Sequence, residues 1–324
     1  MNKKKRSAKM RLKSGAVSGV LTLSLTLSAI APNAASAIQR STNTTDAQSV
    51  NSQYLNLETG KIEYTLPGIV SRYLWQLPQR TVSVNGVKLS EPAVVMNDTL
   101  YLPLRAFANA LGNATVNYNK STRTATLSMS GLYLTATDGG FVTYANDRPL
   151  FSFSPNVLMS NGRMYIPASA LTKATGVRIE SQDSGSVSIK GTYKALTPAS
   201  KYYREDEVYW LSKIISAESQ GESLIGQIAV GDVIMNRVKS SLYPNTIYSV
   251  IFDRNYGVQF SPILNGTIYN TPSYNSVLAA KICLEGATFA DEVMFFLQPE
   301  LSASSWIPRT REYCFTVGRH DFYK

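Results

Sequence analysis

The C-terminal third of the chain carries a helical hydrophobic pattern that is interrupted by two carboxylates. In the stretch 207–238, EVYWLSKIISAESQGESLIGQIAVGDVIMNRV, apolar residues recur at steps of three and four from Val208 to Ile215, and Glu218 and Glu222 continue the series. This spacing places them on one face of a helix for as far as the helix continues. The Ser-Gln-Gly that follows Glu218 predicts the end of this helix, and a second helix is expected from about Glu222.

The middle of the chain alternates with a period of two. TVSVNGVKL contains the Asn-Gly pair that is typical of a tight hairpin turn. The block NDTLYLPLRAFANALG at 97–112 recurs as NGRMYIPASALTKATG at 161–176, an offset of 64 residues. A repeat at a fixed offset is typical of a duplicated supersecondary unit. We predict that two units of strand, strand, helix and closing hairpin pair into one β-rich domain over residues 81–191.

Further elements are expected near the C-terminus. TPSYNSVLAAKICLEG predicts a helix with Ser273 near its N-cap and Gly286 near its C-cap. EVMFFL predicts a strand, and the last 20 or so residues predict a closing strand pair. The expected fold class is α+β, with a small duplicated β-rich domain with short helices followed by a mainly helical domain at 203–324 that has a small β element.

The N-terminal residues are typical of a secretory signal peptide. A basic head precedes the apolar run GAVSGVLTLSLTLSAIAP, and an Ala-Ser-Ala cleavage site stands before Ile38. An uncleaved membrane anchor is the alternative, but the cleavage site and the Ser and Thr within the run favour removal of residues 1–37. Residues 38–80 and 192–202 are expected to be linkers. No later stretch reaches the ~18 apolar residues needed to span a bilayer, so we expect no stable membrane span and an exported protein.

Composition narrows the chemistry further. The net charge of the 324-residue chain is +10, but the basic head alone holds seven basic residues and no acidic one, so nucleic-acid binding is not inferred. A single histidine, His320, excludes zinc sites that need two histidines and is expected to be structural. A disulfide between Cys283 and Cys314 is possible in an exported protein. Two separate thiols are favoured because Cys283 lies in an apolar helical run.

Glu218 is the candidate catalytic residue. A carboxyl group on the apolar face of a helix end has a raised pKa, because burial disfavours its charged form. Such a group can act as a general acid, as glycosidic cleavage requires. Position alone favours a structural role at the helix end. Glu222, at a helix start, can interact with the helix dipole or cap backbone amides.

The region 203–324 resembles the catalytic domain of the spore cortex-lytic enzyme family of cell wall hydrolases. The motifs that carry this resemblance are ISAESQGE, GQIAVGDVIMNRV, YPNTIYSVIF, QFSPILNGTIYNTPS, SSWIPRTREY and TVGRHDFY. The resemblance implies a lysozyme-like fold and cleavage of peptidoglycan glycan, many members being lytic transglycosylases. It makes Glu218 the catalytic acid and Glu222 a supporting residue. Ser216 and Gln220 stand where Gly and Arg are more usual, which bears on local geometry and substrate preference.

Polar and aromatic residues near the C-terminus are candidates for substrate binding. Amide and hydroxyl groups can hydrogen-bond to sugars, and aromatic rings can stack on them. Gln259 and Phe260 belong to a motif that is shared with the family, and Tyr269 and Asn270 follow in the same loop-like stretch. Trp306 is expected either to line the sugar groove or to pack, and a solvated loop is the alternative for any one of these residues.

Residues 81–191 resemble the copper amine oxidase N-terminal-like domain. The resemblance rests on the paired motifs YLPL…A…LG and YIPA…A…TG. The name implies copper, but no His or Cys occurs in this stretch and its methionines are scattered, so metal binding is rejected and no cofactor is expected. A wall-binding or spacer module and a plain structural domain are equally favoured.

The expected function is that of a secreted enzyme, associated with the cell wall or the spore, that cleaves peptidoglycan glycan strands. Glu218 would protonate the glycosidic oxygen and the substrate would assist, as in a lytic transglycosylase. Plain hydrolysis with a second carboxylate, Glu222 or Asp232, is one alternative. A non-catalytic wall-binding protein is another. The sequence leaves open whether cortex or vegetative wall is the substrate, and which oligomeric state the protein has.

Overall fold

The computed structural model describes residues 53–56, 61–64, 77–96, 98–152, 157–255, 257–302 and 306–324. The predicted signal peptide and its cleavage site lie outside these residues. Within the stretch predicted as the first linker, β1 (Gln53–Asn56) and β2 (Lys61–Tyr64) pair as an antiparallel hairpin. No helix in the described part of the chain is long and apolar enough to cross a membrane.

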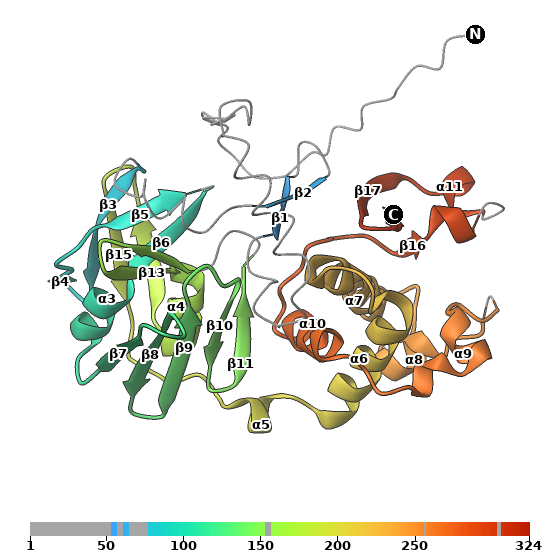
Figure 1. Cartoon of the computed structure of the whole chain (residues 1–324), viewed down its shortest axis with the longest axis horizontal. Coiled ribbons are helices and arrows are strands. Elements are labelled where there is room, and N and C mark those ends of the chain that lie inside the picture. The colour runs from blue at the N-terminus through green and yellow to red at the C-terminus, as the bar shows by residue number, and fades with distance from the viewer. Residues whose placement is uncertain are drawn as a thin grey trace, which may run out of the picture. The chain divides into compact units, whose positions relative to one another are not determined.

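The β-rich domain contains two sheets, one of them an antiparallel meander in the order β11-β10-β9-β8-β7 (Figure 1). Its strands are β7 (Thr115–Asn119), β8 (Thr124–Met129), β9 (Leu132–Thr137), β10 (Val142–Ala145) and β11 (Arg148–Phe151). The other sheet runs β12-β13-β6-β5-β3-β15-β14, with β4 paired to β3. Its strands are β3 (Gln79–Val84), β4 (Val87–Lys88), β5 (Ala93–Met96), β6 (Thr99–Pro103), β12 (Leu158–Ser160), β13 (Arg163–Pro167), β14 (Arg178–Gln182) and β15 (Ser186–Lys190). Neighbouring strands are antiparallel except β3 and β15, which are parallel.

The sequence repeat forms the centre of the second sheet. Strand β6 leads directly into α3 (Leu104–Leu111), and β13 leads in the same way into α4 (Ala168–Thr175). The two repeated strands pair with each other antiparallel, so that Tyr101 lies opposite Pro167 and Pro103 lies opposite Tyr165. This symmetric register confirms the predicted pairing of two duplicated units.

The C-terminal domain is built on three helices that pack against one another, α6 (Glu205–Ser219), α7 (Leu224–Lys239) and α10 (Tyr274–Leu284). Shorter helical segments accompany them: α5 (Ala199–Tyr202), α8 (Ile247–Ile251), α9 (Ser261–Asn265), η3 (Thr267–Tyr269), η4 (Pro299–Leu301) and α11 (Ile307–Thr310). A three-stranded sheet in the order β16-β18-β17 completes the domain, from β16 (Phe295–Leu297), β17 (Tyr313–Val317) and β18 (His320–Tyr323). The predicted α+β class and the closing strand pair are confirmed.

Capping explains where these helices begin. Helix α6 ends at Ser219, as predicted, but α7 begins at Leu224 rather than at Glu222. The reason is that the Ser223 side chain accepts a hydrogen bond from the backbone N–H of Gly226, at 3.2 Å, and so supplies the N-cap. Ser273 caps α10 in the same way, as the sequence predicts.

Side chains of α6 and α10 pack directly against Gly231 of α7. A Cβ atom at this position would lie 2.7 Å from Cys283 Sγ on α10 and 2.9 Å from Ile215 Cδ1 on α6. Cys283 is 4% exposed, Cys314 is half-buried, and both are free thiols in this structure.

The two equivalent glycines of the repeat give a test of its packing. Gly112 and Gly176 both end a helix at positive φ, but only at Gly176 would a Cβ meet neighbouring atoms, Lys194 Cβ and the Lys194 carbonyl oxygen, each at 3.0 Å. Gly112 lies at φ +84° and ψ +155°, a region that glycine alone enters readily, so Gly112→Ala should cost about 1–3 kcal/mol of unfolding free energy through backbone strain alone. Gly176 lies in the left-handed helical region, where strain alone costs about 1–2 kcal/mol. Gly176→Ala should cost roughly 1–3 kcal/mol beyond that strain, because the Lys194 backbone must also move. Urea unfolding measures both, and a loss of about 1 kcal/mol or less in Gly176→Ala would contradict the packing described.

Candidate active site

Glu218 lies in the last turn of α6, at the end that meets the three-stranded sheet. Ile214 and Ile215, in the preceding turn, are completely buried, and Ser219 is 3% exposed. Burial raises the pKa of the Glu218 carboxyl to about 7. Among the described residues, no hydrogen bond or ion pair is found for this carboxyl group. The group therefore has the surroundings of a general acid that can carry a proton near neutral pH.

Glu222 is held on the turn between β17 and β18. Its side chain is 6% exposed, and its carboxylate accepts hydrogen bonds from Arg319 Nε at 2.9 Å and from the Arg319 backbone N–H at 3.3 Å. Gly318, at φ +58°, leaves room for this carboxylate, because any side chain there would overlap Glu222 Oε2. Glu222 thus fixes the loop after Glu218 to the sheet.

His320 lies beside Glu222. The sequence predicts only a structural role for His320, and its Nδ1 lies 3.9 Å from Glu222 Oε1. His320 is 6% exposed, and burial lowers its pKa although the Glu222 carboxylate opposes that shift. The neutral imidazole is therefore a buried neighbour of Glu222.

A chain of buried polar groups connects the three helices around the Glu218 turn. Gln227, which is fully buried, donates from Nε2 to the Glu222 carbonyl oxygen at 3.0 Å and accepts from Ser276 Oγ at 2.8 Å. Ser276 Oγ lies 2.7 Å from Ser273 Oγ, and the Ser273 backbone N–H donates to Ser216 Oγ at 3.1 Å. The sequence analysis missed Gln227 and Ser276, although a glutamine inside an apolar helix is a signal of a buried hydrogen bond.

Lys213 is a third residue whose role the sequence does not predict. This buried lysine, 7% exposed, donates from Nζ to the carbonyl oxygens of Tyr269 at 2.8 Å and Asn270 at 2.9 Å. The Tyr269 side chain remains 61% exposed. Lys213 therefore fixes the backbone of the loop while the Tyr269 side chain stays accessible to a ligand.

The other candidate binding residues differ in exposure. Phe260 is 3% exposed and packs in the core, with the Arg237 guanidinium 5.3 Å from its ring centroid, so its ring supports neighbouring residues rather than offering a free face. Gln259 donates from Nε2 to the Gly257 carbonyl oxygen at 3.1 Å. Trp306 is 51% exposed and lies edge-on against Phe295, with 5.6 Å between the ring centroids.

Asp232, the other candidate for a second carboxylate, faces the interior. It is 2% exposed and accepts hydrogen bonds from the backbone N–H groups of Phe289 at 2.6 Å and Ala290 at 3.2 Å. Burial raises its pKa to about 7, and these two hydrogen bonds oppose that shift. Asp232 holds the loop after α10 and is not exposed to a substrate.

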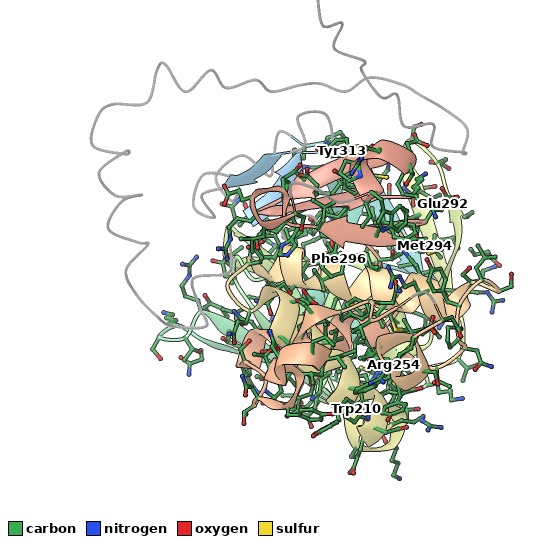
Figure 2. All side chains as sticks on the ribbon, turned by 90° about the vertical axis from the view of Figure 1, so that its right-hand side faces the viewer. Trp210, Arg254, Glu292, Met294, Phe296 and Tyr313 are labelled. Carbon is green, nitrogen blue, oxygen red and sulfur yellow. The ribbon has the colours of Figure 1, made fainter. Side chains whose placement is uncertain are left out.

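The direction of α6 indicates where Glu218 lies relative to the three-stranded sheet. Figure 2 shows Trp210 of α6 low in the view, with Phe296 and then Tyr313 of the three-stranded sheet above it. The helix runs from Trp210 toward that sheet, since the loop that follows it contacts Arg319 through Glu222. Glu218 thus lies where the helices meet the sheet.

Comparisons with known proteins find a separate family match for each of the two domains. Residues 221–323 match the family described as Cell Wall Hydrolase. The C-terminal domain belongs to the cell wall hydrolase family. Residues 81–189 match the copper amine oxidase N-terminal domain. The hydrolase match begins at Gly221, after Glu218, so it contains Glu222 but not the candidate acid.

Curated relatives and solved structures are similar to the same part of the chain. A spore cortex-lytic enzyme of Bacillus cereus is 32% identical over 122 residues, which are 38% of this chain and 46% of that enzyme. The corresponding Bacillus subtilis enzyme is 28% identical over 120 residues, 37% of this chain and 38% of that enzyme. The chain thus spans less than half the length of these relatives. One solved structure is the catalytic domain of the germination-specific lytic transglycosylase SleB from Bacillus anthracis, which is 31% identical, with a TM-score of 0.35. The match covers 38% of this chain and 98% of that domain.

Lys213 offers a test of how the loop is positioned. Lys213→Met keeps the aliphatic stem but removes both hydrogen bonds to the loop, which should lower the unfolding free energy by about 1–3 kcal/mol. Backbone hydrogen exchange in residues 267–272 should become faster. Lys239→Met, on the exposed end of α7, is the control and should change neither quantity. Unchanged exchange in Lys213→Met would show that the loop is held by other contacts.

Proposed function

We propose that this protein is a secreted or wall-associated enzyme that cleaves the glycan strand of peptidoglycan, as a lytic transglycosylase with Glu218 as its acid and base. The observation that carries the proposal is the Glu218 carboxyl group, which is half-buried, has a pKa of about 7 and lacks a partner among the described residues. It belongs to a stretch that resembles the family motif and directly precedes a cell wall hydrolase match. Relatives named spore cortex-lytic enzymes support spore cortex as one candidate substrate.

The reaction needs a single carboxyl group. Glu218 donates its proton to the glycosidic oxygen as the bond from that oxygen to C1 breaks. The C6 hydroxyl of the same sugar attacks C1 and gives its proton to the Glu218 carboxylate, which regenerates the acid. The products are a free hydroxyl on the leaving sugar and a 1,6-anhydro end on the other, so no water is consumed.

The surroundings of the other carboxylates favour this route over hydrolysis. A hydrolase of the two-carboxylate type requires a second carboxylate that can activate water or attack C1. Glu222 is occupied by Arg319, and Asp232 by two backbone N–H groups in the interior. Substrate assistance takes the place of the second carboxylate in this proposal.

The substrate contacts are assigned to accessible side chains of the C-terminal domain, of which Tyr269, Asn270 and Trp306 are exposed and Gln259 is half-buried. The amide and aromatic side chains of Gln259, Tyr269, Asn270 and Trp306 are assigned to hydrogen bonding and stacking with sugars. Phe260 is assigned a supporting role, because its ring is buried. Glu222 is assigned the support of the loop that follows Glu218.

Substitution of Glu218 gives the most direct test. Glu218→Gln keeps shape and hydrogen bonding but cannot supply a proton, so the rate should fall at least ~10²–10⁴-fold. Glu222→Gln should cost less, because the amide oxygen can still accept a hydrogen bond from Arg319. Mass spectrometry of the muropeptides released from cortex and from vegetative wall measures both rates.

The same measurement separates the alternatives. Release of 1,6-anhydro ends by the unmutated protein supports the lytic route, and release of reducing ends supports hydrolysis. If the protein binds wall glycan but releases no muropeptide from either substrate, it is a binding protein and the proposal fails. Activity that survives Glu218→Gln and vanishes in Glu222→Gln would reverse the two assignments.

The pH dependence follows from the raised pKa of Glu218. Because the acid must be protonated, kcat/KM should fall as pH rises through about 7. The raised pKa also means that the folded state binds this proton more tightly than the unfolded chain, so its contribution to stability is present below the unfolded pKa and is lost as pH rises through about 7. Glu218→Gln should therefore be at least as stable as the unmutated protein above pH 7, as thermal unfolding can measure. A rate that rises through pH 7 would contradict the acid role.

A further inference from the structure

A cluster of charged and aromatic side chains joins the β-rich domain that contains the repeat (81–191, the repeat domain) to the C-terminal domain (203–324, the hydrolase domain). The cluster is centred on Glu285, the residue that follows α10. The Arg148 guanidinium, on β11 of the repeat domain, donates to both carboxylate oxygens of Glu285, from Nε at 2.6 Å and from Nη2 at 2.7 Å. The side chains of Arg148 and Glu285 are 4% and 2% exposed. This bidentate geometry is the strongest form of an arginine–carboxylate pair.

Three further residues complete the cluster. Lys173, on α4 of the repeat domain, places Nζ 2.8 Å from a Glu285 carboxylate oxygen and 2.8 Å from the Glu285 carbonyl oxygen. Tyr203 donates its hydroxyl to the same carboxylate. Arg148 stacks over the Tyr202 ring, with Cζ 3.3 Å from the ring centroid. The buried carboxylate is thus paired with two cations and hydrogen-bonded to a phenol.

The contact extends beyond the charged cluster. Strand β11 lies beside α10 (Figure 1), and Val142 and Phe151 pack against the hydrophobic core of the hydrolase domain. Burial and a side-chain hydrogen bond with Tyr274, the first residue of α10, raise the pKa of Tyr144 on β10. The repeat domain therefore contacts α10 along β11 and through the Glu285 cluster.

The ion pair is suited to a permanent contact. Burial alone would raise the pKa of Glu285, but hydrogen bonds from Arg148, Lys173 and Tyr203 lower it, so the carboxylate stays charged at neutral pH. Removing one partner of a buried pair leaves an uncompensated charge and is strongly destabilising. Separation of the two domains would leave the charges of Arg148, Lys173 and Glu285 without their partners.

The segment between the domains is itself attached to the repeat domain. The Ala199 backbone N–H donates to the Asn146 carbonyl oxygen at 3.0 Å, and the Asn146 side chain donates to the Leu196 carbonyl oxygen at 2.7 Å. Residues 192–202, predicted as a linker, are therefore bound along the surface of the repeat domain.

Helix α10 connects this contact with the candidate active site. At its N-terminal end, Ser273 binds Ser216 of α6, and Ser276 binds Gln227, which in turn binds the Glu222 carbonyl oxygen. Ser216 and Glu222 lie on either side of Glu218. A shift of α10 would be transmitted through these buried hydrogen bonds to the turn that carries the acid.

We propose that the repeat domain is a positioning partner of the hydrolase domain. It binds the C-terminal end of α10 through Arg148 and Lys173 and thereby holds the Glu218 turn in its active geometry. The two domains then move as one body, rather than as a catalytic domain with a freely tethered wall-binding module. The expected effect on activity rests on the proposed function. The rigid contact between the domains is independent of that function.

The test uses the full chain with Arg148→Met. Its matched control is Arg123→Met, which removes the same kind of side chain from an exposed ion pair with Asp138 inside the repeat domain. In Arg148→Met, trypsin should cleave after Lys194, Lys201 and Arg204 at least about tenfold faster, since these exposed residues flank the contact. Hydrogen exchange in α10 and in residues 217–222 should also become faster. Arg123→Met should behave as the unmutated protein does.

Activity gives the second readout. Because displacement of a catalytic group costs turnover, kcat of Arg148→Met should fall about tenfold or more while KM changes less than about twofold. The pH at which kcat/KM declines should move below that of the unmutated protein, because a loosened turn hydrates Glu218 and lowers its pKa. A purely structural role for Arg148 would lower stability without moving this pH.

Milder variants keep the test decisive if Arg148→Met does not fold. Tyr203→Phe removes a single hydrogen bond to Glu285, and Arg148→Lys keeps the charge but not the bidentate geometry. Each should show the same changes to a smaller extent. Unchanged proteolysis, exchange and pH profile in a folded variant would overturn the proposal. If the unmutated protein releases no glycan, the proposed function fails, and proteolysis and exchange alone decide whether the domains are joined.

Discussion

The close approach of three helices at Gly231 is the constraint on which the candidate site depends. The missing side chain at Gly231 leaves room for Ile215 of α6 and Cys283 of α10, and the buried hydrogen bond from Ser276 to Gln227 also joins α10 to α7. With the helices fixed in this way, the last turn of α6 is held against the sheet. Glu218 is left half-buried but without a partner among the described residues.

The three carboxylates Glu218, Glu222 and Asp232 acquire different chemical properties from their surroundings. Glu222 is bound by Arg319 and Asp232 by backbone N–H groups, so both are structural. Glu218 is half-buried with no such compensation, and burial alone determines the direction of its pKa shift. The stability lost by ionising such a group is the usual cost of keeping an acid ready at neutral pH.

Sequence patterns predicted those features that depend on neighbours in the chain. The repeat, the end of α6 at Ser219, the Ser273 cap and the closing strand pair all follow from local periodicity and turn chemistry. The roles of Lys213, Gln227 and Arg148 were not predicted, because each of these side chains binds a partner that is distant in sequence. Periodicity carries no information about such pairs. The contact between His320 and Glu222 was missed for the same reason. Helix α7 begins later than predicted because the Ser223 cap, rather than the apolar pattern, determines where the helix starts.

The buried pair of Arg148 and Glu285 also links the evolutionary histories of the two domains. A free tether allows one domain to be exchanged for another without change to its neighbour. Here an exchanged repeat domain must bring a cation to the position of Arg148, or the hydrolase domain must lose the charge of Glu285 at the same time. Substitutions at these two positions are therefore expected to occur together, and the two domains to be inherited as one unit.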